Sequence, residues 1–124
     1  MNYKKNNNPS ETFAIEINGE FAGYVGIHSL NENPLKEKGA IGIIGYCMHP
    51  KFRGLGITTK AVKFLTEYAF KKYKLKRISG RCRSFNKASA KVLEKVGYKL
   101  EGIHRKESYK NGKYCDNIIW AKVK

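Results

Sequence analysis

Alternating apolar and polar residues predict β-strands near both ends of the chain. Phe13, Ile15 and Ile17 recur with a period of two, which is the pattern of a strand that buries one face. Asn-Gly pairs at positions 18–19 and 111–112 predict tight hairpin turns between neighbouring strands. The predicted strands span residues 12–18, 20–30, 40–48, 75–83, 98–109 and 113–122.

Two stretches between these strands change to a helical period. In the first stretch, one face carries the apolar residues Ile57, Ala61, Leu65, Tyr68 and Ala69. This spacing predicts a helix over 57–73. In the second stretch, Asn86 stands where it can cap a helix that continues to Val96, and Gly97 follows as a C-cap residue.

The order of these elements predicts an α/β domain. The strand over 40–48 is apolar on both faces and is therefore expected at the centre of the sheet. We expect a mixed, mostly antiparallel sheet of about six strands, with two helices and one parallel crossover. A single domain is expected over 1–124, with residues 1–11 flexible and residues 31–39 forming a polar connection.

The composition is strongly basic, with 25 Lys and Arg against 10 acidic residues and a formal net charge of +15. Such a charge suits a polyanionic partner such as nucleic acid, a ribosome or a phosphate-rich cofactor, or reflects a general bias toward lysine. No run approaches the roughly 18 to 20 apolar residues of a membrane span, and the N-terminus has no signal-peptide pattern, so no membrane partner is expected. Cys47, Cys82 and Cys115 have no metal-ligand spacing, which predicts reduced thiols in a cytoplasmic protein and no metal.

A glycine-rich turn lies where the central strand leads into the first helix, in the sequence Y-C-M-H-P-K-F-R-G-L-G-I-T-T-K-A-V from Tyr46 to Val62. Pro50 cannot donate to a sheet ladder and so ends the strand. Gly54 and Gly56 permit backbone angles that a Cβ disfavours. Free N–H groups at the start of the following helix favour an anion there. The spacing matches neither a P-loop nor a dinucleotide fingerprint.

The turn resembles the pyrophosphate-binding signature of the GNAT superfamily of N-acetyltransferases, with Arg53 and Gly56 in its first and fourth positions and Thr58 departing at the sixth. A second segment, R-C-R-S-F-N-K-A-S-A-K-V-L-E-K-V-G-Y-K-L-E-G, is similar to another cofactor-binding element of that family. Both segments look like the branch that acetylates ribosomal-protein N-termini. The likeness extends over about residues 13–122 and implies an N-acetyltransferase that uses acetyl-CoA.

The resemblance also implies roles for individual residues. The CoA diphosphate would lie on backbone N–H groups of Arg53, Gly54, Leu55, Gly56, Ile57, Thr58 and Thr59, and pantetheine beside Tyr46, Cys47 and Met48. Asn86 would contact the cofactor or serve only as a helix cap. Ser89 would protonate the leaving thiolate or serve only as a small residue at a helix–sheet contact. Leu93 occupies the position where many relatives carry a catalytic tyrosine.

The general base is less defined by the sequence. Ile44 stands where relatives often have a glutamate, and the remaining candidates are Glu107, His104, Glu101 and Asp116, of which we single out Glu107. At pH 7 about a tenth of an α-amine is neutral, against about one part in 2,500 of a lysine side chain. A site with no evident base therefore favours a protein N-terminal α-amine or another amine of low pKa as acceptor.

The family usually has a strand and two helices ahead of the matched region, and these wall the acceptor site. Without them, apolar surface beside the cleft would be exposed, so a homodimer is one expectation. Two other functions stay open: a basic RNA- or ribosome-binding module, and a CoA-binding relative without activity. The sequence has no RNA-stacking motif, so nucleic acid is not expected as a substrate.

Overall fold

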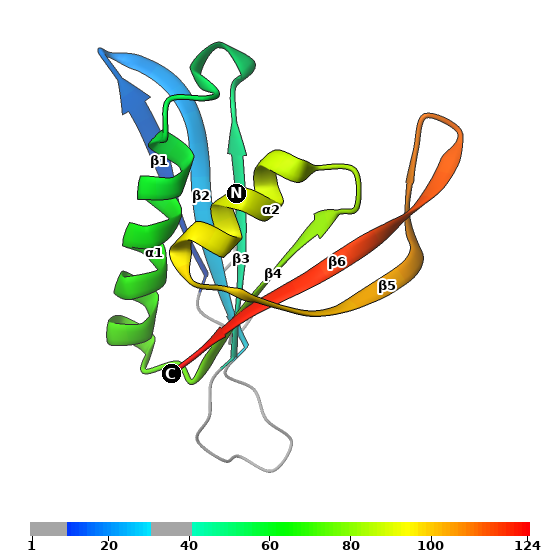
Figure 1. Ribbon diagram of the computed structural model, residues 1–124. Helices are drawn as coiled ribbons and strands as arrows, with labels where there is room; N and C mark the ends of the chain where they lie inside the picture. Colours follow the sequence, from blue (N-terminus) through cyan, green and yellow to red (C-terminus); the bar gives the residue numbers. More distant parts are fainter. Residues whose placement is uncertain (1–9, 31–40) are drawn as a thin grey trace.

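The computed structural model describes residues 10–30 and 41–124, which form one sheet and two α-helices (Figure 1). A short 3-10 helix lies between β3 and α1, at Pro50–Phe52. The other elements, in chain order, are β1 Ser10–Ile17, β2 Glu20–Leu30, β3 Ile41–Met48, α1 Ile57–Tyr73, β4 Arg77–Arg83, α2 Lys87–Val96, β5 Lys99–Lys110 and β6 Lys113–Val123.

The six strands are ordered β1-β2-β3-β4-β6-β5. All neighbouring pairs are antiparallel except β3 and β4, which are parallel and joined by the crossover through α1. The predicted mixed sheet is thus confirmed, with β3 near its centre. Ser10 and Glu11, expected in a flexible segment, instead begin β1. The rest of that segment and the predicted 31–39 connection lie outside the described residues.

Both predicted Asn-Gly hairpin turns are confirmed. Asn18 and Gly19 have φ of 50° and 82°, and Asn111 and Gly112 have φ of 54° and 78°. Left-handed angles at both central residues match the right-handed twist of the flanking strands. These turns therefore fix the register of the β1–β2 and β5–β6 pairs.

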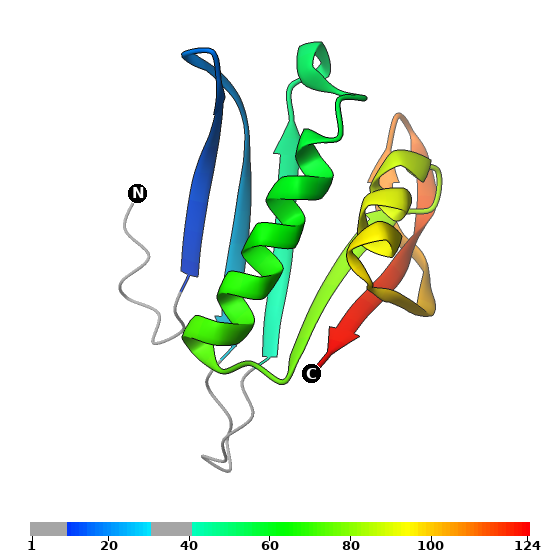
Figure 2. The ribbon, with the colours of Figure 1, turned by 60° about the vertical axis from the view of Figure 1, so that its left-hand side comes forward.

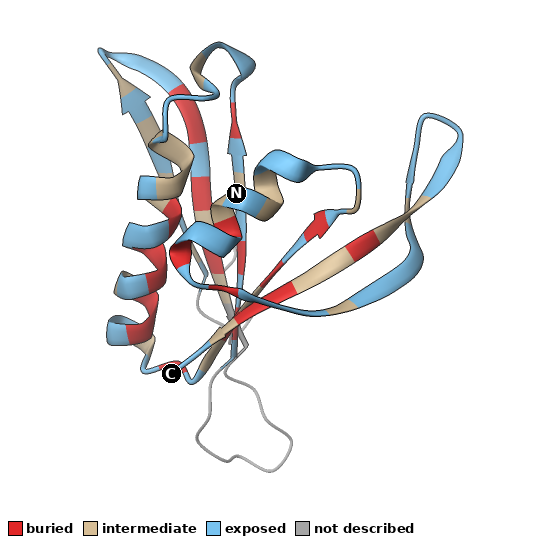
Figure 3. Cartoon of the chain, in the orientation of Figure 1, coloured by how far each residue is buried: buried red, intermediate tan, exposed pale blue. Residues whose placement is uncertain are grey.

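The two helices pack side by side on one face of the sheet, α1 over β2 and β3 and α2 over β4 (Figure 2). Buried and exposed positions alternate along β3, as expected for a strand with one covered face (Figure 3). One continuous core lies between the helices and the sheet. Its members include Val25, Ile27, Ile44, Val62, Leu65, Ala69, Ile78, Leu93 and Trp120.

A polar contact joins β1 to α1. The Glu11 carboxylate accepts hydrogen bonds from the hydroxyls of Tyr68 and Tyr73 and from the ammonium group of Lys72. Burial raises the pKa of Glu11, but these hydrogen bonds outweigh burial, and the net effect is a lowered pKa.

Within the described residues, no helix covers the opposite face of the sheet, which we call the open face. Ile41 and Ile43 of β3 are 41% and 39% exposed there, and Tyr24 of β2 is 45% exposed. The open face therefore carries an apolar area beside the strands that lead to the glycine turn.

Candidate functional site

The turn between β3 and α1 presents an uncapped helix start. Gly54 and Gly56 have φ of 80° and 74°, and a Cβ at either position would meet no atom within 4 Å. Gly56 is the N-cap residue of α1, and no side chain caps the helix there. The guanidinium Nε of Arg53 donates to the Met48 carbonyl at 3.2 Å and so ties the turn to the end of β3. Space and free N–H groups at this turn fit a phosphate group.

Beside this turn, the parallel strands β3 and β4 separate. Their pairing is confined to Ile41–Ile43 of β3 and Arg77–Ser79 of β4, whereas on its other side β4 is paired with β6 from Arg77 to Arg83. The diverging ends of β3 and β4 are visible in Figure 1. In α/β sheets, ligands bind outside the carboxyl ends of such strands. We call the region between these unpaired strand ends, beyond Ile43 of β3 and Ser79 of β4, the slot.

Tyr46 and Ser89 meet on the helix side of the slot. Tyr46 lies on the diverging half of β3, and its hydroxyl is 2.6 Å from Oγ of Ser89 in the first turn of α2. The same hydroxyl lies 3.3 Å from the Ser89 carbonyl oxygen. Oδ1 of Asn86 accepts a hydrogen bond from the Ser89 backbone N–H at 3.1 Å, so Asn86 is the N-cap of α2. The structure thus brings together three of the predicted site residues.

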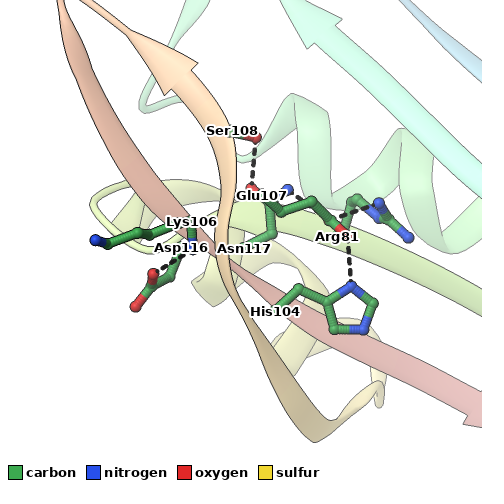
Figure 4. A network of polar contacts seen from close by, with 7 residues as sticks. All are labelled: Arg81, His104, Lys106, Glu107, Ser108, Asp116 and Asn117. Atoms are coloured by element: carbon green, nitrogen blue, oxygen red, sulfur yellow. Dashed lines mark hydrogen bonds and ion pairs between the residues drawn. The ribbon is translucent and has the colours of Figure 1, made fainter.

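A second polar cluster, which we call the Glu107 network, lies on the open face (Figure 4). The Glu107 carboxylate accepts hydrogen bonds from Arg81 at 2.7 Å and from the Asn117 amide at 2.8 Å, and its other oxygen lies 2.7 Å from Nδ1 of His104. Ser108 donates to the Asn117 side chain at 3.0 Å. Three donors around one carboxylate keep it ionised.

The pKa of Glu107 is lowered by the hydrogen bonds from Asn117 and His104, and further by the charge of Arg81. The side chain is 34% exposed, so an incoming ligand can reach it. A carboxylate with a lowered pKa binds a cation well but takes up a proton poorly. Of the four candidate bases, Glu107 and His104 are in contact with each other. Glu101 is instead paired with Arg77, and Asp116 accepts a hydrogen bond from the Lys106 backbone N–H.

An irregular stretch of β5 positions this network. The β5–β6 register shifts between His104 and Ser108, and Lys106 has φ of 52°. Asp116 Oδ1 accepts from the Lys106 N–H at 2.8 Å, which holds the bulged backbone in place (Figure 4). Bulges of this kind often re-aim side chains next to functional sites. Here the bulge brings the side chains of Glu107 and His104 into contact.

The other residues predicted to contact the cofactor lie at the end of β3 and in the turn that follows it. Cys47 is exposed and Met48 is buried at the end of β3, and Leu55 at the tip of the turn is 62% exposed. Sequence reasoning did not single out Arg81 or Asn117, the two partners that hold Glu107. The sequence held one possible signal, because Asn117 directly precedes the apolar residues 118–121 of the last strand. In the structure its side chain is only 5% exposed, and a buried amide needs hydrogen-bond partners.

An opened parallel strand pair beside an uncapped, glycine-rich helix start is an arrangement by which α/β domains bind phosphate-bearing ligands at their strand ends. Comparison of the sequence with known families makes this assignment specific. Residues 1–99 match the family described as Acetyltransferase (GNAT) domain, and the chain belongs to this family.

Individual relatives agree with the family assignment. YjcK of Bacillus subtilis (strain 168) is 41% identical over 78 residues, which is 63% of this chain and 43% of that protein. The spermidine N(1)-acetyltransferase of Escherichia coli (strain K12) is 28% identical over 106 residues, or 86% of this chain and 54% of that enzyme. A structure of RimL, a ribosomal L7/L12 alpha-N-protein acetyltransferase in complex with coenzyme A, superposes with a TM-score of 0.79 at 25% identity.

The RimL superposition covers 92% of this chain and 62% of RimL. The chain likewise spans about half the length of the curated relatives that it matches. None of the helices in the described part of the chain is long and apolar enough to cross a membrane.

Proposed function

We propose that this domain transfers an acetyl group from acetyl-CoA to a primary amine. The observation that carries the proposal is the slot between β3 and β4, which opens directly beside the uncapped start of α1. In this arrangement the CoA diphosphate would accept hydrogen bonds from backbone N–H groups between Arg53 and Thr59. Pantetheine would lie along Tyr46, Cys47 and Met48 in the slot. Bound acetyl-CoA would supply the acetyl thioester.

Backbone groups in the slot would polarise the thioester carbonyl. The diverging half of β3 is not paired with β4, so one edge of this strand has no ladder partner on that side. An N–H group on that edge can donate to the carbonyl oxygen, as in an oxyanion hole. Asn86 and the turn then fix the position of the ligand, and Ser89 offers its hydroxyl to the leaving sulfur from the helix side.

Glu107 and His104 would receive the acceptor amine from the open face. The carboxylate of Glu107, held ionised by its three neighbours, would attract and orient the ammonium group of the acceptor. Because the Glu107 carboxylate has a lowered pKa and therefore takes up a proton poorly, His104 is proposed as the proton acceptor of the pair. Its side chain is 48% exposed and can pass the proton to water.

The acceptor is proposed to be a protein N-terminal α-amine or a small amine. An imidazole removes a proton from an α-amine more readily than from a lysine, whose pKa is about 10.4. The match to a ribosomal-protein acetyltransferase supports the first class, and the match to a spermidine acetyltransferase supports the second. Reduced thiols in the described residues are consistent with a cytoplasmic location.

A thiol-release assay with acetyl-CoA tests the proposal directly. The acceptors would be N-terminal peptides, polyamines and aminoglycosides, with thiol measured over time. We expect turnover with at least one class and a loss on the order of 10²-fold in kcat for Ser89→Ala. No thiol release with any acceptor, despite binding of acetyl-CoA by calorimetry, would instead indicate an inactive CoA-binding relative.

The net charge of +15 supports one alternative function, which is binding of RNA or of the ribosome without catalysis. If the domain were an RNA- or ribosome-binding module, calorimetry would detect binding of a short RNA and not of acetyl-CoA.

The exposed apolar residues of the open face, such as Ile41 and Ile43, support a homodimer as a further proposal. Sedimentation that gives only monomer at tens of micromolar would argue against it.

A further inference from the structure

The hydroxyl pair of Tyr46 and Ser89 spans two elements that the sheet does not connect at this point. Tyr46 belongs to the half of β3 beyond its last pair with β4, and Ser89 belongs to α2, which packs over β4. Their oxygens are 2.6 Å apart, which is short for a neutral O–H···O hydrogen bond. The contact therefore joins the unpaired end of β3 to the first turn of α2, beside the place proposed for the ligand sulfur.

This pair differs from the other tyrosine–hydroxyl pair of the described residues. Tyr98 and Thr66 are 2.8 Å apart, and both are almost completely buried, at 2% and 1% exposure. That contact satisfies two polar groups inside the core and faces no ligand space. Tyr46 and Ser89 are only partly buried and border the slot. The Tyr98–Thr66 pair is therefore structural, whereas the Tyr46–Ser89 pair is placed where it can act on a ligand.

The two hydroxyls can donate in a chain toward the slot. Tyr46 has one proton, which it can give to Ser89 Oγ, and the Ser89 proton then points elsewhere. Burial raises the pKa of Tyr46, more than the Ser89 hydrogen bond lowers it, so the phenol keeps its proton throughout the neutral range. Tyr46 is therefore available as a donor whenever the slot is occupied.

We propose that Tyr46 is a positioning residue that aims the Ser89 hydroxyl at the sulfur of coenzyme A and replaces the proton that Ser89 gives up. The inference rests on the proposed acetyl transfer. As the amine nitrogen bonds to the acetyl carbon, the C–S bond breaks and its electron pair goes to sulfur. The sulfur takes the proton of Ser89 Oγ, and Ser89 takes the proton of Tyr46. Solvent then returns a proton to Tyr46, and the proton lost by the amine leaves through His104 to solvent.

Acidity explains why such a chain is useful. A thiol has a pKa of about 8.5 and a phenol one of about 10, whereas an aliphatic hydroxyl is a far weaker acid. If Ser89 acted alone, it would be left as an alkoxide, which is much less stable than the thiolate it had protonated. With Tyr46 behind it, the transient anion is a phenolate, and even with the pKa of Tyr46 raised by burial a phenol is a much stronger acid than an aliphatic hydroxyl. The chain lets a serine take the place of a stronger acid.

The ionisation of coenzyme A in the complex tests this without turnover. The Kd of coenzyme A is measured by calorimetry from pH 6.5 to 9.5 for the wild-type protein, Tyr46→Phe, Ser89→Ala and Tyr98→Phe. A donor aimed at the sulfur stabilises the thiolate. We therefore expect the thiol of coenzyme A to have a pKa about one unit lower when bound to the wild type than when bound to Tyr46→Phe. At high pH this corresponds to about tenfold tighter binding of coenzyme A by the wild type, relative to the affinities at low pH. Ser89→Ala should match Tyr46→Phe, and Tyr98→Phe should match the wild type. Acetyl-CoA has no ionisable thiol and should bind all four proteins with the same pH dependence.

Turnover gives the second readout. Tyr46→Phe keeps the ring, so KM for acetyl-CoA should stay constant while kcat falls about tenfold, the effect expected for one lost donor. Tyr98→Phe should lower the thermal midpoint without lowering kcat. If the thiol of coenzyme A has the same pKa when bound to folded Tyr46→Phe as when bound to the wild type, the inference is overturned and the proposed function is left intact. Failure of the wild-type protein to bind coenzyme A would overturn the proposed function itself.

Discussion

Replacement of Gly56 by glutamate or by glutamine offers a matched test of the turn before α1. Both side chains carry the same strain from φ of 74° and project into the same space, where a Cβ meets no atom within 4 Å. They differ only in charge. Since Gly56 caps α1 without any side-chain bond, the carboxylate introduced by Gly56→Glu would lie beside the first free N–H groups of the helix. Stability and ligand binding should then respond in opposite directions.

The magnitudes follow from Coulomb's law at an exposed site. A carboxylate about 5 Å from each of two diphosphate charges is repelled by about 1.7 kcal/mol in water, and by about half of that at physiological salt. Gly56→Glu should therefore bind acetyl-CoA about 5- to 20-fold more weakly than Gly56→Gln. In contrast, the helix dipole favours the carboxylate by about 0.3 to 1 kcal/mol, which raises Tm by about 1 to 5 °C.

Calorimetry with acetyl-CoA and thermal unfolding of the ligand-free variants measure the two effects. Titrations at about 50 and 500 mM salt should show the difference between the two variants shrinking as the charges are screened. Equal affinities for the two variants at low salt would refute the placement of the diphosphate at this turn. A higher Tm of Gly56→Glu together with equal affinities would do so most clearly, because it would show that the carboxylate does reach the helix start.

Two further predictions concern the scaffold. Glu11→Gln should lower the free energy of unfolding by about 1 kcal/mol at pH 7. Because the pKa of Glu11 is lowered in the folded state, this difference should shrink as pH falls below the ordinary glutamate pKa of about 4.3 and should disappear below the lowered pKa, which urea unfolding over a series of acidic pH values can measure. Gly23→Ala should cost about 1 to 3 kcal/mol or more, since its Cβ would lie 2.2 Å from the Cys47 carbonyl oxygen, whereas Gly45→Ala on the neighbouring strand meets nothing within 4 Å and should change stability by less than about 0.5 kcal/mol.

Local signals in the sequence were sufficient for the elements of the fold. The apolar period predicted α1 from Ile57 to Tyr73, and the structure places its ends at the same residues. Asn86 and Gly97 marked the ends of α2 because caps are made by residues adjacent in sequence. β1 begins earlier than predicted, because Ser10 and Glu11 pair with β2 and side chains of α1 hold the Glu11 carboxylate. No local pattern could anticipate that contact.

The candidate site was only partly predictable for the same reason. The turn at Arg53–Gly56 is continuous in sequence, and its conformation follows from its glycines. Tyr46 and Ser89 are 43 positions apart, and Arg81 and Glu107 are 26 positions apart, so their contacts depend on strand order and register. Sequence could name Ser89 and Glu107 as candidates but not the partners that set their protonation.

The two halves of the candidate chemistry lie on opposite faces of the sheet. On β3, Ile43 and Cys47 face the open face, so Tyr46 points to the helix side, where Ser89 lies. On β4, Arg81 points to the open face, where it contacts Glu107. His104 contacts the same carboxylate. An intact sheet would separate these groups by its own thickness. At the slot no backbone ladder separates the two faces, because β3 and β4 are unpaired beyond Ile43 and Ser79. A thioester lying in the slot would have its sulfur toward Ser89 and its carbonyl carbon open to an amine that arrives from Glu107. We therefore expect substitutions at Tyr46 to alter the proton donated to sulfur, and substitutions at Glu107 to alter the affinity for the amine, with little effect of either on the other.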